Sequence, residues 1–307
     1  MKKNLPIAPA ILISALICLL ACRKTINTID TSPTSPVKVD SARSHADSTK
    51  STTDTTSVPY PQSPMMGCNY SPDYGDSIVY TQPVTGQDYV ISPVNNSGVA
   101  GTYFAWPGGL SLNAHSGAID LTKSETGARY QIGFVKEGTT DTCLSQLIVG
   151  GAAYMDSVYV LSESDTIAAP YFNANPYGTP PCSSNGSSGG PGCQFDYNNA
   201  AKNQGVEIDN HTGFIDLKKT MKNSLFGLLP LDGTTVNTTI YYKLSDNSNF
   251  APQKIQVKLM FYNKKSGIPP SLLSSITNKL MNTLQNLLLI KSNTSPRPPL
   301  IIITRFN

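Results

Sequence analysis

One short pattern occurs twice in this chain, and it restricts the fold more than any other feature of the sequence. Residues 109–121 read GLSLNAHSGAIDL and residues 205–217 read GVEIDNHTGFIDL, so the two copies align without a gap. In each copy, apolar and polar residues alternate on both sides of a polar stretch that ends in Ser-Gly or Thr-Gly, which predicts strand, turn and strand. Two β-hairpins separated by the length of one small domain predict two tandem β-sandwiches rather than a solenoid.

The rest of the sequence agrees with an all-β protein. Short alternating segments punctuated by turn residues predict strands in both halves, at 77–80, 88–92, 101–105, 129–135, 146–149, 154–160, 238–244 and 254–262. Low charge (14% Asp, Glu, Lys and Arg) with many Gly, Pro and Tyr residues is typical of secreted β proteins. A formal net charge of only +3 does not favour a nucleic-acid partner.

The pattern changes after the Pro-Pro pair at 269–270. Leucine and isoleucine recur at three- and four-residue spacing from Ser271 to Ile290, which predicts an amphipathic helix. Its polar face carries few cations, so docking on the second sandwich is favoured over a membrane surface, although a partner protein stays open. The run Leu300–Thr304 predicts a buried strand. We therefore divide the chain into a signal peptide (1–21), a tether (22–66), two β-sandwich domains (67–153 and 154–267) and a C-terminal helix and strand (268–307).

The repeated hairpin resembles the core of cadherin-like and immunoglobulin-like modules of bacterial envelope proteins, F/L-x-I/L-D/N-x-x-T/S-G-x-I. The resemblance covers about fifteen residues of each domain and implies two tandem immunoglobulin-like or cadherin-like β-sandwiches. The calcium motifs of cadherins, L-D-R-E and D-x-N-D-N, have no counterpart in this sequence. The resemblance therefore implies the fold without calcium, and we expect no cofactor and no metal.

The first residues predict export. Lys2 and Lys3 precede an apolar run at 11–20 that is too short to span a membrane, as in a signal peptide. The sequence Leu19-Leu20-Ala21-Cys22 matches a lipobox and resembles that of bacterial (Bacteroidetes-type) envelope lipoproteins, which implies lipidation of Cys22 and a membrane anchor. Arg23 stands where an Asp signals inner-membrane retention, so the resemblance favours the outer membrane, with the periplasmic or surface face open.

About half of the residues from Thr31 to Val58 are Ser or Thr, and few are apolar, which predicts a disordered tether. Within it, Asp-Ser/Thr pairs recur every seven residues and resemble the acceptor motif of Bacteroidetes-type protein O-glycosylation. The resemblance makes Ser41, Ser48 and Thr55 candidate glycosylation sites, and a bare linker is the alternative.

Four cysteines remain after the tether. An exported protein meets an oxidising compartment, so an even number predicts disulfides, although four cysteines allow three pairings. Cys182 with Cys193 would close a Gly/Ser-rich loop, and Cys68 would then pair with Cys143. A zinc site is disfavoured because no C-x-x-C pair occurs.

Few residues suggest catalysis. His115 and His211 occupy matching turn positions, which favours polar turn residues over a general base or a metal ligand. Neither an H-E-x-x-H motif nor a P-loop occurs, so we expect no enzyme activity.

Aromatic side chains are the remaining hint of a ligand. Trp106, Tyr171 and Tyr177 are candidate ligand contacts because exposed aromatic rings stack on sugars, while Trp106 would equally fill a sandwich core. The sequence thus predicts a noncatalytic, lipid-anchored envelope protein for adhesion or scaffolding, with an envelope protein or a glycan as partner. The alternative is a carbohydrate-binding outer-membrane lipoprotein.

Overall fold

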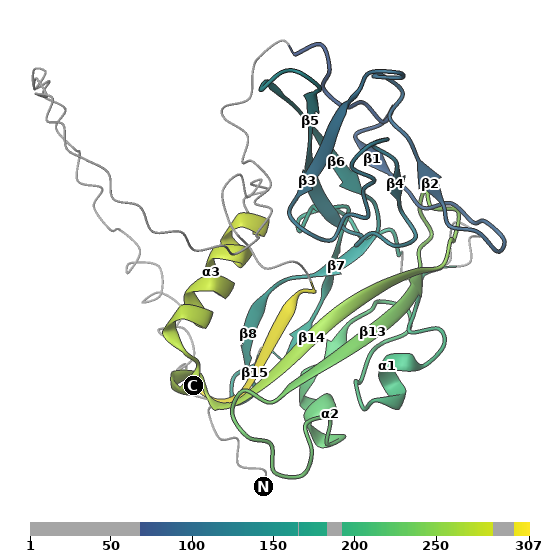
Figure 1. The fold of residues 1–307 in the computed structure, drawn as a ribbon. Helices are drawn as coiled ribbons and strands as arrows, with labels where there is room; N and C mark the ends of the chain where they lie inside the picture. Colours follow the sequence, from purple (N-terminus) through teal and green to yellow (C-terminus); the bar gives the residue numbers. More distant parts are fainter. Residues whose placement is uncertain (1–67, 165, 183–191, 285–297) are drawn as a thin grey trace, which may run out of the picture. The chain divides into compact units, whose positions relative to one another are not determined.

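The structure is a computed structural model that describes residues 68–164, 166–182, 192–284 and 298–307, all of which belong to one compact unit. The predicted signal peptide and tether, with Cys22, Ser41, Ser48 and Thr55, lie outside the described residues. Strands in several sheets dominate this unit and helices are few (Figure 1), which agrees with the predicted β class.

The first half of the unit is built on one four-stranded sheet with the order β1-β6-β5-β3. Strand β5 pairs antiparallel with both β3 and β6, whereas β1 adds to the edge of β6 in parallel. A separate pair, β2 with β4, packs Ile91 and Ile119 against the same core. The strands are β1 (Ile78–Val79), β2 (Val90–Ile91), β3 (Gly101–Trp106), β4 (Ile119–Asp120), β5 (Ala128–Lys136) and β6 (Thr142–Val149).

The second half contains a five-stranded sheet with the order β11-β13-β14-β15-β8 and two short pairs, β10 with β7 and β12 with β9. Its elements are β7 (Ala152–Tyr154), β8 (Ser157–Val160), β9 (Ile167–Ala168), β10 (Pro170–Phe172), β11 (Gln194–Phe195), α1 (Ala200–Asn203), β12 (Ile215–Asp216), α2 (Leu217–Lys222), β13 (Thr235–Lys243), β14 (Gln253–Lys264), the 3-10 turn η1 (Lys265–Gly267), α3 (Pro270–Leu284) and β15 (Leu300–Phe306). Three neighbouring strands, β14, β15 and β8, run parallel, so this sheet is mixed.

The strand predicted over 154–160 is in fact two strands in different sheets. The chain leaves β7 after Tyr154 and enters β8 at Ser157, and Asp156 lies between them. The Asp156 carboxylate accepts a hydrogen bond from the backbone N–H of Leu300 at 3.0 Å. Asp156, which lies between two apolar runs of the sequence, therefore holds the first residue of β15 at the edge of β8.

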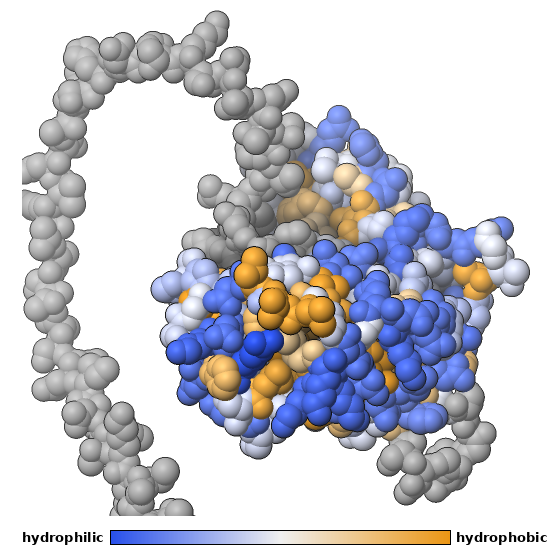
Figure 2. Space-filling view, turned by 90° about the horizontal axis from the view of Figure 1, so that it is seen from below, coloured by the Kyte–Doolittle hydropathy of each residue, from blue (hydrophilic) through white to orange (hydrophobic). Residues whose placement is uncertain are grey.

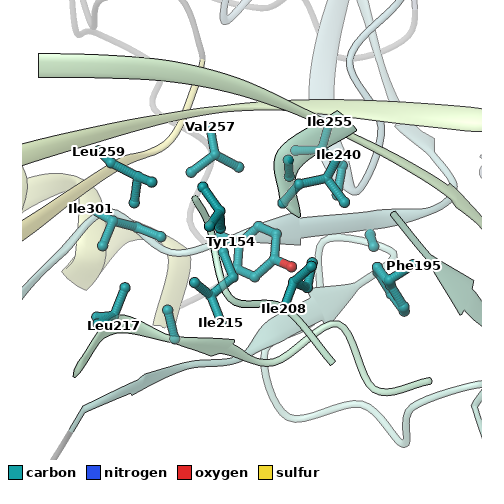
Figure 3. Close-up of a cluster of buried hydrophobic side chains, with 14 of the residues drawn as sticks. Tyr154, Phe195, Ile208, Ile215, Leu217, Ile240, Ile255, Val257, Leu259 and Ile301 are labelled. Carbon is teal, nitrogen blue, oxygen red and sulfur yellow. The ribbon is translucent and has the colours of Figure 1, made fainter. Parts of the chain in front are cut away.

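The alternation in β14 and β15 places side chains on the two faces of this sheet, because successive residues of a strand point in opposite directions. One face carries Ile255, Val257, Leu259 and Ile301 into a large core around Tyr154 (Figure 3). The other face carries Met260, Tyr262 and Ile302 toward α3. Because both faces are covered, Ile301, Ile302 and Ile303 are each fully buried, as the apolar run predicts.

Helix α3 packs on the sheet, which confirms the predicted docking. Its Ile276 is 3% exposed and lies in a cluster with Tyr262, Ile268 and Ile302. Lys279 adds an ion pair with Asp156 at 3.7 Å. The predicted helix end at Ile290 lies outside the described residues.

Two short helices are not predicted by the sequence pattern. The second hairpin strand was expected to reach Leu217, but the chain turns into α2 there because the Asp216 carboxylate accepts the N–H of Lys219 at 2.8 Å and caps the helix. Similarly, the Asp196 carboxylate accepts the N–H groups of Ala201 and Lys202, both at 2.9 Å, at the start of α1. Local hydrogen bonds accepted by these aspartates start both helices, and at Asp216 the helix replaces the end of the predicted strand.

Each half of the unit has its own hydrophobic core. At the boundary between them, the Tyr242 hydroxyl of the second half shares a hydrogen bond with the Thr126 hydroxyl and accepts the backbone N–H of Ala152. The number of independently folding domains therefore stays a prediction, which unfolding experiments test.

Candidate functional site

The repeated segments form the same turn twice. The side-chain oxygen of Asn113 accepts two backbone N–H groups in the first turn, and that of Asp209 accepts the matching two in the second. Gly117 and Gly213 close the turns with φ of +72° and +73°, a conformation that glycine adopts at little cost. The hairpin strands themselves are short, with one bridge between residues 112 and 119 and one between residues 208 and 215.

A tyrosine holds each turn from a distant part of the chain. The Tyr74 hydroxyl donates to the Gly117 carbonyl oxygen at 2.7 Å, and the Tyr154 hydroxyl donates to the Gly213 carbonyl oxygen at 2.5 Å. Neither tyrosine belongs to the repeated segment, so the sequence pattern alone does not identify them.

Tyr74 also lines an open pocket of about 510 Å³, which we call the tyrosine pocket. Two further tyrosines, Tyr80 and Tyr89, line it together with the polar side chains of Asp76, Gln82 and Asn247. Strands β1 and β2, which lie near each other in Figure 1, contribute aliphatic residues to the lining. The lining therefore combines aromatic rings with polar groups in an open hollow.

Hydrogen bonds position the polar part of the tyrosine pocket. The Gln82 amide donates to the backbone oxygen of Asn247 at 2.8 Å and accepts from the side chain of Asn249 at 2.6 Å. The Asn173 amide donates to the Tyr80 hydroxyl at 3.1 Å. Residues from both halves of the unit therefore fix this site before any ligand binds.

The environment raises the pKa of two tyrosines of this pocket, Tyr74 and Tyr80. Burial raises the pKa of Tyr74 well above its usual range, with a smaller contribution from Tyr103. Burial and the nearby Asp246 carboxylate also raise the pKa of Tyr80, although the Asn173 hydrogen bond opposes them. Both hydroxyls are protonated at neutral pH, as an ordinary tyrosine also is, so each gives the pocket an uncharged polar group.

The aromatic residues expected from the sequence lie elsewhere. Trp106 is half-buried and stacks on Phe104 with ring centroids 5.7 Å apart, and its buried indole nitrogen has no hydrogen-bond partner among the described residues. Tyr171 is only 5% exposed, which differs from the expectation of a ligand contact, because its strand β10 pairs with β7 and carries it into the interior. Tyr177 is 72% exposed in a loop and none of the three lines the tyrosine pocket.

Both expected disulfides are present. Cys182 joins Cys193 with Cα atoms 5.1 Å apart, and Cys68 joins Cys143 with Cα atoms 5.5 Å apart. The first pair closes the segment 183–191, which lies outside the described residues, and the second ties the start of the unit to β6.

The two histidines of the described residues lie exposed at the hairpin turns. His115 lines a second open pocket of about 500 Å³ with Lys136 and Glu137, whereas His211 does not. Within the described ranges, no group of three or more His, Cys, Asp and Glu residues could hold a metal ion. Within those same ranges, no helix combines the length and apolar character needed to cross a membrane.

Comparisons with known proteins give a weak likeness to cadherin domains. No protein-family model matches the chain, and no curated protein matches it. Human protocadherin-24 EC1-2 is similar over 60% of this chain and 93% of that one, with 9% identity and a TM-score of 0.20. Drosophila N-cadherin EC1-4 is similar over 63% of this chain, which spans about half (49%) of that fragment, with 9% identity and a TM-score of 0.19. At such TM-scores the likeness carries no argument about function.

Proposed function

We propose that the protein is a noncatalytic, lipid-anchored protein of the outer membrane that acts in adhesion or scaffolding. The observation that carries this proposal is the order of features along the chain. A lipobox ending at Cys22 comes first, a Ser/Thr-rich tether follows, and a disulfide-linked β unit begins at Cys68. Acyl chains on Cys22 would anchor the unit stably, because each buried methylene contributes roughly 0.8 kcal/mol.

Labelling with radioactive palmitate in a bacterial host tests this proposal. The wild-type chain should incorporate label, and Cys22→Ala should abolish incorporation and leave the precursor uncleaved. Cys18→Ala is the matched control, because Cys18 lies within the apolar run and should leave labelling unchanged. A wild-type chain that takes up no palmitate would rule out the lipid anchor.

A second candidate function, carbohydrate binding, is favoured by the composition of the tyrosine pocket. Tyrosine rings beside amide and carboxylate groups match the apolar faces and hydroxyl edges of a sugar. Tyr89 and Asn247 come from different halves of the unit and both line the pocket.

Glycan-array screening followed by calorimetry tests the second candidate. A saturable ligand should lose at least tenfold in affinity, about 1.4 kcal/mol, with Tyr89→Ala and with Asn247→Ala. Tyr177→Ala, which changes an exposed tyrosine outside the pocket, should leave the affinity unchanged. Loss of binding only with Tyr177→Ala would place the ligand at the loop, and an absence of saturable binding would leave adhesion or scaffolding alone.

A further inference from the structure

A leucine-rich loop between α2 and β13 is the most exposed apolar feature of the described residues. Leu228, Leu229 and Leu231 are 88%, 89% and 77% exposed, more than any other large hydrophobic side chain in the described part of the chain. We call Leu228–Leu231, which includes Pro230, the leucine loop. Clustered apolar side chains held in water usually mark a contact surface.

The leucine loop is fixed at both ends, so its exposure is a property of the fold. Before it, Phe226 is buried and packs on Phe261 with ring centroids 5.9 Å apart. After it, the Asp232 carboxylate accepts the backbone N–H of Asn263 at 2.6 Å, and the N–H of Gly233 donates to the carbonyl oxygen of Phe261 at 2.8 Å. The leucines therefore project from an anchored base at the end of β14.

Cations lie on the elements that hold the two ends of the leucine loop. Exposed lysines on α2 precede the loop, and Lys264, Lys265 and Arg305 lie at the ends of β14 and β15. Phe306, 52% exposed, pairs in register with Lys264 and adds an apolar side chain. Figure 2 views the molecule from this end and shows apolar residues gathered among hydrophilic ones. The α2 lysines are Lys218, Lys219 and Lys222.

Carboxylates among the described residues at this end offset the positive charge only in part. Asp216 is paired with Lys219 at 3.3 Å, Asp232 follows Leu231 directly, and Glu163 lies near Arg305, whose carbonyl oxygen accepts the N–H of Ser162. An exposed apolar tip with lysines on the elements at both of its ends suits the boundary of a bilayer, where leucines enter the acyl region and lysines meet anionic headgroups. Protein interfaces, in contrast, are depleted in lysine.

We propose that the leucine loop inserts into the surface of a lipid bilayer that contains anionic lipids. The contact is separate from acylation of Cys22, and it would set the orientation of the β unit on the membrane. It differs from α3, whose apolar face is covered by the sheet.

Tryptophan fluorescence on the full chain tests this inference. Leu229→Trp places a reporter in the leucine loop, and Tyr177→Trp is the matched control at another exposed loop position. The unaltered chain, whose single tryptophan is Trp106, is the blank. Vesicles of phosphatidylcholine and phosphatidylglycerol carry brominated acyl chains that quench an inserted indole. Residues 1–22 are the same in both variants, so any membrane binding by that segment affects both reporters equally.

We expect several-fold stronger quenching, with a blue shift, for Leu229→Trp than for Tyr177→Trp, and weaker quenching on phosphatidylcholine alone. Adding Leu228→Ser and Leu231→Ser to the Leu229→Trp chain should reduce the quenching. Equal quenching of the two reporters, or none, would overturn the inference and point to a protein partner for the loop. Repeating the measurement with Cys22→Ser separates the two membrane contacts, because quenching that persists there supports the loop even if palmitate labelling fails.

Discussion

The hydroxyl groups of Tyr242 and Thr126 lie 2.5 Å apart and share a hydrogen bond in the interior of the protein. Tyr242 belongs to the second half of the unit and Thr126 to the first. The same tyrosine oxygen accepts the backbone N–H of Ala152 at 3.1 Å and donates to the Gln253 side chain at 2.9 Å. This one hydroxyl thus satisfies polar groups on both sides of the boundary.

Tyr242→Phe removes the hydroxyl. The Thr126 hydroxyl, the Ala152 N–H and the Gln253 side chain then stay buried without this hydrogen-bond partner. We expect the free energy of unfolding to fall by about 1–3 kcal/mol, because a buried donor or acceptor that loses its partner keeps its desolvation cost. Urea unfolding measures the change. Tyr241→Phe, on the neighbouring half-buried tyrosine, is the control and should change the stability by less; an equal loss from both variants would contradict the role of the Tyr242 hydroxyl.

Gly117→Val and Gly213→Val should each destabilise the hairpin that contains them. A side chain at positive φ costs about 1 kcal/mol or more. A Cβ atom would also lie 2.8 Å from the Tyr103 ring at Gly117 and 2.7 Å from the Phe195 ring at Gly213. Gly98→Val separates the cost of positive φ from that of the steric contact, because Gly98 has φ of +76° and an added Cβ would have no atom within 4 Å. This variant should therefore lower the stability less than the other two.

Calorimetry of the same glycine variants tests the number of domains. If the halves fold independently, Gly117→Val should lower one thermal transition and Gly213→Val the other. One shared transition that shifts with either variant would show that the halves unfold together, as the Tyr242 hydrogen bonds would favour.

Asp209 should make part of the stability depend on pH. Hydrogen bonds from the N–H of Thr212, and then of His211, lower the pKa of the Asp209 carboxyl in spite of partial burial. A depressed folded-state pKa stabilises the protein above the unfolded value of about 3.9, and this contribution is lost as the pH falls through the folded-state pKa. Asp209→Asn should keep the turn and weaken the loss of stability in acid, since Asn113 makes the matching bonds in the first hairpin.

Urea unfolding across the acid range measures this dependence. Because Asp209 is mostly exposed, its contribution to the loss of stability in acid should be modest. Asp73→Asn, at an exposed aspartate outside the hairpins, is the control. Identical acid dependence in the wild-type and Asp209→Asn proteins would contradict the prediction.

The two disulfides should contribute unequally to stability. In the chain-entropy model, closing the 75-residue separation of Cys68 and Cys143 contributes about 4.5 kcal/mol, against about 3 kcal/mol for the 11-residue separation of Cys182 and Cys193. To measure this difference, both cysteines of one disulfide are replaced by alanine at a time. Denaturant unfolding then compares the free energies of unfolding of the two double variants. Mass mapping without reduction checks the pairing, and free thiols at Cys182 and Cys193 would contradict it.

Ile276→Asp should separate α3 from the sheet. A carboxylate in the cluster with Tyr262 and Ile302 should cost roughly 3 kcal/mol or more, since an unpaired charge is poorly tolerated in an apolar site. Ser275→Asp, on the exposed neighbour, is the control. Truncation after Gly267 should be more severe, because it also removes β15 from inside the sheet; a soluble truncated protein of equal stability would contradict both expectations.

Patterns that repeat over a few residues were predictable from the sequence. The alternation over 254–262 predicted the strand β14, and the polar stretches that end in Ser-Gly and Thr-Gly predicted the turns at Gly117 and Gly213. The spacing of leucines and isoleucines predicted α3 and its docking. In each case the local pattern reflects the one surface that the element must bury.

Features that depend on distant residues were not predictable. The parallel pairing of β15 with both β14 and β8 has no local signature, and the tyrosine pocket joins Tyr74 and Tyr89 to Asn247 of the other half. The sequence feature that comes nearest to predicting the tyrosine pocket is the number of tyrosines between residues 70 and 89. Its meaning becomes clear only when the structure shows that β1 and β2 in this segment are very short strands. The aspartates that start α1 and α2 act through side-chain hydrogen bonds that periodicity does not detect.

The pairing of β8 with β15 also sets an order of events in time. When a chain emerges N-terminus first from a ribosome or a membrane pore, β3, β5 and β6 can pair as soon as Val149 is free. Strand β8 emerges soon afterwards but has no neighbour in its sheet until residues 301–304 arrive. Pairing over so long a separation is slow, and an apolar strand without a partner is prone to aggregate. The interval between the emergence of β8 and that of β15 is therefore when this chain most needs protection by a chaperone.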